Sequence, residues 1–211
     1  MAIDQEAAVT GIRQHILDAA EQVIQELGVK AATTKEIARR AKCAEGSIYR
    51  YFPDKQALFH EIVKTRYPQF LALVETLPDR AGSGMVRKNL EAVALTALAF
   101  YRAILPMMVG AMSDRELLEQ QRLHFQERGG GPMKAIRLVA TYLWNEKRLG
   151  RISERSSPEH LTRLLLGACS SQALLDAMIG EDARLGTDEQ FARDIVRTLL
   201  ESAEPRRATI K

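Results

Sequence analysis

The residue types that most often carry out chemistry are few in this chain and lie far apart. Four histidines fall on separate predicted helices: His15, His60, His124 and His160. No nucleophile elbow, His-Glu zinc motif or nucleotide-binding loop accompanies them. The two cysteines, Cys43 and Cys169, are distant from each other, so neither a disulfide framework nor a metal site is expected. Distant residues can converge in a fold, but the sequence predicts no enzyme and no cofactor.

Basic side chains are concentrated in one short segment. The 211 residues hold 30 Lys and Arg against 27 Asp and Glu, a formal net charge of +3. Residues 33–66 alone contain eight basic and four acidic residues, an excess larger than that of the whole chain. Such a surplus permits contact with a polyanion, so this segment is the candidate for binding nucleic acid.

The elements that must position this segment are helices. Aromatic residues make up only 6% of the chain, and apolar residues recur at helical spacing, which favours an all-α fold. The first predicted helix carries one apolar stripe at Ile12, Ile16, Ala20, Val23 and Leu27, and Gly28 ends it. A short second helix follows the capping residues Thr33 and Thr34.

A third short helix spans Glu45 to Phe52, since Pro53 disfavours helical geometry in the residue before it. Asp54 caps a long fourth helix that ends before Pro78. Further helices are expected near 84–104, 106–128 with an alternative break at Ser113, 132–149, 158–179 and 187–203. Two short helices joined by a tight turn have the layout of a helix-turn-helix, which presents its last helix to the DNA major groove.

Residues 34–58 read TKEIARRAKCAEGSIYRYFPDKQAL, which closely resembles the DNA-binding signature of the TetR family. The resemblance is strong over residues 10–64 and continues as helix order beyond them. It implies a three-helix DNA-binding domain over residues 1–54. A helical ligand-binding and dimerisation domain would then occupy residues 55–211, with about nine helices in all.

The resemblance implies a set of DNA contacts: Thr34, Lys35, Ala44, Glu45, Gly46, Ser47, Tyr49, Arg50, Tyr51 and Lys55. Thr34 and Lys55 would bind phosphate, and Gly46 would let the third helix approach the groove. Tyr49 and Tyr51 would contact phosphate or thymine methyls, with packing as their alternative role. Arg50 would take guanine or phosphate. The packing side of the two short helices would be Ile37, Ala38, Ala41, Ile48 and Phe52.

Three positions depart from the family pattern. Lys42 stands where the turn usually has glycine, and Ala44 where a Ser or Thr cap is usual, so one cap is expected to be missing. Glu45 places an acid opposite a polyanion. It would either accept from cytosine N4 or cap its own helix, and we favour capping. Lys35, Arg39 and Arg40 form a solvated face if they do not read bases.

The remaining helices are expected to bind an effector and a second copy of the chain. The predicted pocket residues are Phe70, Phe100, Tyr101, Met107, Met108, Met112, Gln121, His124, Phe125 and Trp144. The predicted dimer residues are Leu161, Leu164, Leu165, Ala168, Leu175, Ile179, Phe191, Ile195 and Leu199. Core packing within one chain is the alternative for both sets.

These expectations describe a ligand-responsive repressor. It would bind a palindromic operator as a homodimer in the cytoplasm, without a membrane partner, and a small, largely apolar effector would release it by shifting the fourth helix. The alternative is a helical adaptor protein that keeps the fold without operator recognition.

Overall fold

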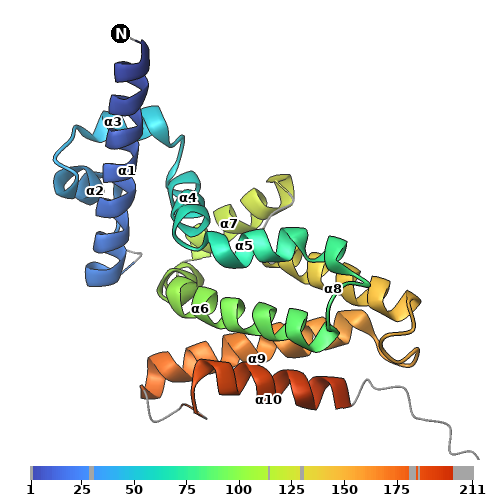
Figure 1. Ribbon diagram of the computed structural model, residues 1–211. Helices are drawn as coiled ribbons and strands as arrows, with labels where there is room; N and C mark the ends of the chain where they lie inside the picture. Colours follow the sequence, from blue (N-terminus) through green and yellow to red (C-terminus); the bar gives the residue numbers. More distant parts are fainter. Residues whose placement is uncertain are drawn as a thin grey trace, which may run out of the picture. The chain divides into compact units, whose positions relative to one another are not determined.

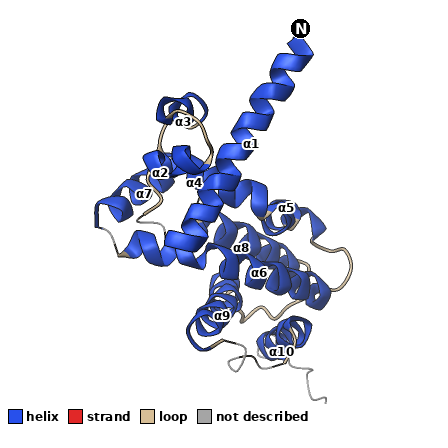
Figure 2. Ribbon diagram, turned by 90° about the vertical axis from the view of Figure 1, so that its left-hand side faces the viewer, coloured by secondary structure: helices blue, strands red, loops and turns tan. Residues whose placement is uncertain are grey.

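The computed structural model describes residues 2–28, 31–113, 115–128, 131–180, 184 and 186–201, and every regular element in these ranges is a helix (Figures 1 and 2). The α-helices are α1 (Ala2–Leu27), α2 (Thr34–Arg40), α3 (Glu45–Tyr51), α4 (Lys55–Arg66), α5 (Pro68–Thr76), α6 (Val86–Met112), α7 (Arg115–Arg128), α8 (Pro132–Arg148), α9 (Pro158–Ile179) and α10 (Asp188–Glu201). A 3-10 turn, η1 (Pro78–Arg80), follows α5. The all-α prediction is confirmed.

The chain folds as two compact units, and neither is a single stretch of sequence. The first lies within Met1–Arg66 and Ile104–Arg128, and the second within Tyr67–Ala103 and Gly129–Lys211. The helix α6 therefore contributes to both. The predicted boundary after residue 54 separates a DNA-binding domain from a ligand-binding and dimerisation domain. It is a division by function, and it stays a prediction.

The first unit packs its helices around an apolar core. Its buried residues include Ile16, Leu17, Ala20, Val23, Ile37, Ala38, Ala41, Ile48, Phe52, Leu58 and Ile62. The five residues predicted as the packing side of α2 and α3 are among them, which confirms that prediction. Ile12 and Leu27, at the two ends of the predicted stripe, are 46% and 52% exposed. The apolar stripe of α1 extends beyond the short helices, because α1 has 26 residues and α2 and α3 have seven each.

Local capping explains where these helices begin and end. Gly28 adopts a φ of +81°, which side chains disfavour, and closes α1. The Thr33 hydroxyl accepts from the Glu36 amide at 3.2 Å and caps α2. The Asp54 carboxylate accepts from the Ala57 amide at 2.6 Å at the start of α4. All three predicted boundaries are confirmed.

The predicted long fourth helix is wrong, since α4 ends at Arg66 and α5 begins at Pro68. Tyr67 between them has φ −126° and ψ 49°, because the ring of Pro68 disfavours helical geometry in the residue before it. The predicted break before residue 106 is also wrong. The helix α6 runs through that position to Met112, and Met107 packs against the core of the first unit, so packing outweighs the cost of a proline. The alternative break near Ser113 is the observed one.

The second unit packs α5, α8, α9, α10 and the first part of α6 around a separate core. Its buried residues include Phe70, Leu77, Leu90, Leu98, Tyr142, Leu143, Leu165, Cys169, Phe191, Val196 and Leu199. Burial raises the pKa of the Cys169 thiol to about 12, so this thiol is protonated at neutral pH. Glu146 is also fully buried, where its Oε1 accepts from the Gly82 amide at 3.2 Å and its Oε2 lies 3.2 Å from Arg151 Nε.

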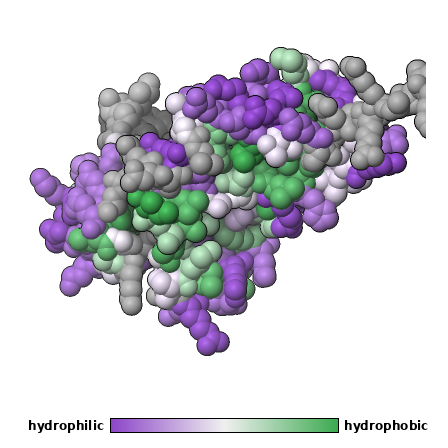
Figure 3. Space-filling view, turned by 90° about the horizontal axis from the view of Figure 1, so that it is seen from below, coloured by the Kyte–Doolittle hydropathy of each residue, from purple (hydrophilic) through white to green (hydrophobic). Residues whose placement is uncertain are grey.

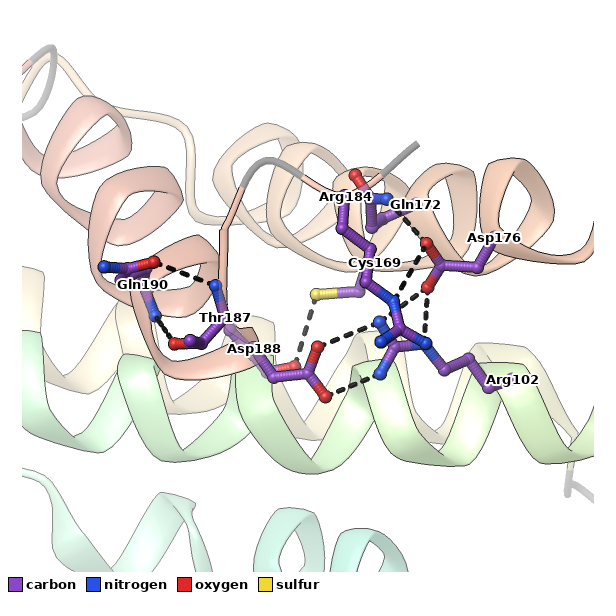
Figure 4. A network of polar contacts seen from close by, with 9 residues as sticks. Arg102, Cys169, Gln172, Asp176, Arg184, Thr187, Asp188 and Gln190 are labelled. Atoms are coloured by element: carbon purple, nitrogen blue, oxygen red, sulfur yellow. Dashed lines mark hydrogen bonds and ion pairs between the residues drawn. The ribbon is translucent and has the colours of Figure 1, made fainter. Parts of the chain in front are cut away.

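Arg102 connects α6 to both C-terminal helices (Figure 4). Its Nε donates to Asp176 at 2.5 Å, and its two terminal nitrogens donate to the Asp188 carboxylate at 2.5 and 2.9 Å. Burial alone would raise the pKa of Asp176, but hydrogen bonds from Gln172 and Arg102 outweigh it and hold that pKa below its ordinary value. The carboxylate is therefore ionised at neutral pH, and the ion pairs tie α6, α9 and α10 together.

Within the described ranges, no helix combines the length and hydropathy of a bilayer span. The same residues contain no group of three or more His, Cys, Asp or Glu side chains placed to hold a metal ion.

Candidate nucleic-acid interface

The turn between α2 and α3 sets the angle at which α3 is presented. Lys42 has a φ of 52°, in the left-handed region that favours glycine. The Cys43 amide donates to the Ala38 carbonyl at 3.0 Å and the Lys42 amide to the Arg39 carbonyl at 3.3 Å. This is the Schellman pattern of helix termination, with Lys42 at its left-handed position. A glycine at this point would adopt the same conformation without a Cβ, which is the conformational reason for the glycine expected in the turn.

The helix α3 begins without a side-chain cap. Ala44 holds the extended geometry of a capping residue, with φ −69° and ψ 144°, but it makes no side-chain hydrogen bond. The predicted missing cap is confirmed. The start of α3 therefore depends on packing, chiefly of Ile48, rather than on a capping side chain.

The outward side of α3 carries small, aromatic and basic residues together. A Cβ added at Gly46 would have no atom within 4 Å, so the surface there is open and low. Tyr49 is 53% exposed and Arg50 is exposed, whereas Ser47 is half-buried. These residues form one solvent-facing surface that a DNA groove can reach.

Tyr51 and Lys55 have packing partners. Tyr51 is half-buried against the core of the first unit, so the packing alternative describes it better than it describes Tyr49. The Lys55 ammonium lies 5.2 Å from the centre of the Phe59 ring, a cation–π contact at the first turn of α4.

Glu45 is bound to α2 rather than to its own helix. Its Oε1 accepts from the Thr34 hydroxyl at 2.6 Å, and the Thr34 oxygen lies 3.3 Å from the Tyr49 hydroxyl. The prediction that Glu45 caps its own helix is wrong, because its hydrogen bond runs across the turn from α3 to Thr34 of α2. Thr34, which is predicted to bind phosphate, is occupied by a carboxylate of the same chain.

Two of the basic residues on α2 are paired with acids. Arg39 donates to Glu36 at 2.6 and 2.9 Å, and Arg40 donates to Glu26 of α1 at 2.7 and 2.9 Å. These hydrogen bonds lower the pKa of both carboxyl groups. Arg39 and Arg40 therefore fit the alternative of a solvated face, while Lys35 is exposed and stays a candidate contact.

Three of the predicted pocket residues come together in the second unit. The Phe70 and Phe100 ring centres are 4.8 Å apart, and those of Phe100 and Tyr101 are 5.6 Å apart. Tyr67, which was not predicted, joins them at 6.2 Å from Phe100. Its position three residues before Phe70 was the available signal. Burial, with a smaller effect of Cys169, raises the pKa of Tyr101 to about 12, so its hydroxyl keeps its proton at neutral pH.

The other predicted pocket residues lie elsewhere. Met107 packs in the core of the first unit. Met112 and Trp144 are 64% and 43% exposed, and the Trp144 indole donates to Glu159 at 2.7 Å. Met108, Gln121 and Phe125 are half-buried, and the side chain of His124 lies outside the described residues. The pocket stays a prediction, now centred on the aromatic cluster.

The predicted dimer residues fall into two groups. The first group agrees with the alternative of core packing within one chain. Its buried members are Leu161, Leu165, Phe191 and Leu199, and Ala168 and Ile195 pack against the same core. Those that are exposed are Leu164, Leu175 and Ile179. Leu174 and Met178 are exposed as well, although they were not predicted. Exposed apolar and small residues of α9 define an apolar stripe: Leu164, Gly167, Ser171, Leu174, Leu175, Met178 and Ile179.

The stripe is visible in the sequence once the buried side of α9 is known. Leu164, Gly167, Ser171, Leu174 and Met178 follow one another at steps of three and four residues, which places them on one face. Figure 3 views the molecule from the side of α9 and α10 and shows hydrophobic groups on that surface. Contiguous exposed apolar side chains of this kind mark an interaction surface.

Comparison with known proteins finds relatives of the first unit. A family described as "Bacterial regulatory proteins, tetR family" matches residues 16–62. The transcriptional repressor BepR of Brucella suis is 48% identical over 65 residues, 30% of each chain. The transcriptional regulator AcrR of Shigella flexneri is 47% identical over 58 residues, 28% of this chain and 26% of its own. The similarity thus spans less than a third of these relatives.

The fold as a whole also has solved counterparts. FadR of Bacillus subtilis, determined in complex with stearoyl-CoA, superposes with a TM-score of 0.66 at 18% identity. The superposition covers 89% of this chain and 97% of that one. At this identity the likeness concerns the fold.

Proposed function

Because residues 16–62 match the family of bacterial regulatory proteins named after TetR, we propose that the chain is a TetR-like transcriptional regulator that represses its target genes. Two copies would bind a palindromic operator together. A small, largely apolar effector would release them.

The outward surface of α3 is the observation that carries the proposal. A helix enters the major groove only if its leading side is uncovered and free of bulk at the point of closest approach. Gly46 meets no atom within 4 Å of an added Cβ, and Tyr49 and Arg50 beside it are exposed. An aromatic hydroxyl and a guanidinium on such a surface supply phosphate and base contacts.

The apolar stripe of α9 supports the homodimer. Two recognition helices about one DNA turn (~34 to 36 Å) apart require a two-fold pair of chains. Leu164 and Met178, near opposite ends of the stripe, are 62% and 73% exposed, so burying them against a second copy would remove a large apolar area from water. Gly167 and Ser171 between them permit close helix contact.

The aromatic cluster supports an apolar effector. Phe70, Phe100 and Tyr101 offer ring faces, and the protonated Tyr101 hydroxyl offers a hydrogen-bond donor. The structural relative FadR binds stearoyl-CoA, which has a long apolar chain. An effector of this class would release the operator only by binding the DNA-incompetent state more tightly.

The test is a fluorescence anisotropy titration with DNA flanking the chain's own gene, an unrelated duplex as control, and two salt concentrations. We expect selective binding to one duplex. Tyr49→Ala should weaken it about tenfold, the size of one or two lost contacts. Trp144→Phe, which changes an exposed aromatic residue of the second unit, should leave it unchanged. Equal affinity for both duplexes at both salt concentrations would favour the adaptor alternative.

A further inference from the structure

The contact between Glu45 and Thr34 bears on how DNA would be selected. The Thr34 hydroxyl has one proton to donate, and in this structure it points to Glu45 Oε1 at 2.6 Å. The Tyr49 hydroxyl lies 3.3 Å from the same threonine oxygen. A bond from a hydroxyl to a carboxylate is charge-assisted and stronger than a neutral one.

A DNA phosphate presents the same chemistry as this carboxylate, namely an anionic oxygen that accepts hydrogen bonds. Thr34 cannot donate its single proton to both. Other acids of the first unit are engaged away from these hydroxyls: Glu36 with Arg39, Glu26 with Arg40, and Asp54 with the Ala57 amide. Glu45, in contrast to these three acids, accepts a hydrogen bond from Thr34.

We infer that Glu45 is a specificity-determining residue, which holds the Thr34 hydroxyl in an internal bond that every DNA phosphate must displace. The inference rests on the proposed function. Displacement costs the same on any sequence and leaves the released carboxylate next to the polyanion. The cost is recovered only where Glu45 accepts from an exposed base amino group, such as cytosine N4. Glu45 thus suppresses binding to random DNA relative to the operator.

The test measures the affinity of the full chain for a pool of random-sequence duplexes at low salt, with Glu45→Gln in three backgrounds. These are the unsubstituted chain, Thr34→Ser, which keeps the hydroxyl, and Thr34→Val, which removes it at similar size. In the two backgrounds that have a hydroxyl, Glu45→Gln should tighten random binding about tenfold, the fold-change equivalent to one charged hydrogen bond. In the Thr34→Val background, the gain should fall below about twofold, because no internal bond remains to be broken.

Each outcome decides between distinct explanations. An equal gain in all three backgrounds would overturn the inference, because loss of charge alone would account for it. No gain in any background would overturn it as well. Failure of the unsubstituted chain to bind any duplex, flanking DNA included, would instead overturn the proposed function and the inference with it. Melting temperatures of the variants confirm that each is folded.

Discussion

Lys42 and Ala44, two residues apart in the helix-turn-helix, are poorly matched to their backbone geometry. Lys42 has a left-handed φ of 52°, and a side chain there costs about 1–2 kcal/mol. Ala44 has the geometry of a cap without an oxygen to make the bond. Both departures are correctable by single substitutions, so each makes a separate prediction about stability.

Ala44→Ser should raise the free energy of unfolding by about 1 kcal/mol, because a serine at this extended position can accept from an amide of the first turn of α3. Denaturant unfolding measures the change. Ala44→Val, which adds bulk but no acceptor, is the control and should give no gain. An equal gain from both variants would contradict the capping explanation.

Lys42→Gly should also stabilise the chain by about 1 kcal/mol, since glycine adopts a φ of 52° without a Cβ penalty. Lys42→Ala removes the same charge but keeps the Cβ, so it should change stability by less than about 0.5 kcal/mol. If thermal and denaturant unfolding show the alanine variant gaining as much as the glycine variant, charge rather than conformation is responsible.

At the scale of elements, the ion pairs of Arg102 make the packing of α6, α9 and α10 depend on pH. The pKa of Asp176 is held below its ordinary value of 3.8, so the stabilisation is fully present above that pH and is lost as pH falls through the lowered pKa. Arg102 itself has a raised pKa, chiefly through its hydrogen bonds to Asp188, and stays charged throughout.

Asp176→Asn should therefore lower the free energy of unfolding by about 2 kcal/mol at pH 7, the order of a hydrogen bond to a charged group. The difference from the unsubstituted chain should shrink as pH falls below 3.8 toward the lowered pKa, where the native carboxylate becomes protonated. Asp194→Asn, whose carboxylate pairs with Arg197 on the exposed side of α10, should cost less than about 0.5 kcal/mol at any pH. A pH-independent difference for Asp176→Asn would contradict the ionic explanation.

The elements that were predictable are those set by local chemistry. Gly28, Thr33 and Asp54 mark helix ends through backbone geometry and caps, which depend on a few neighbouring residues. The course of α6 through residue 106 depends instead on packing by Met107, which is distant in sequence from its partners. Buried Glu146 was equally invisible, since only the fold brings Gly82 and Arg151 to its oxygens.

The candidate DNA surface was predictable for a different reason from the other sites. Its residues lie within one contiguous motif, so their spacing alone places Gly46 and Tyr49 on one side of α3. The dimer and pocket residues come from separate helices. Leu165 and Leu164 are adjacent, yet one is buried and the other 62% exposed, and the periodicity of a wide apolar helix does not say which side faces its own core.

At the scale of the whole molecule, the proposed dimer can be tested apart from DNA. Met178→Glu places a charge on the apolar stripe, where the side chain is 73% exposed in one chain, so folding should be unaffected. We expect light scattering after size exclusion to give a monomer, because an unpaired charge in an apolar interface is costly. Operator affinity should fall in parallel.

Leu123→Glu on α7 is the matched control, with a side chain of the first unit that is 50% exposed. It should leave the dimer intact. A dimer that survives Met178→Glu, or one disrupted equally by Leu123→Glu, would place the interface elsewhere.

The interleaved course of the chain has a consequence for engineering. Sensors are often built by grafting the DNA reader of one regulator onto the effector module of another. Here a graft cut at Arg66 would leave out residues 104–128, and with them α7, which contacts α4 within the same unit. The transplanted first unit, the proposed DNA reader, should keep its native fold only if that second segment travels with it, so a chimera of this chain needs three splice points rather than one.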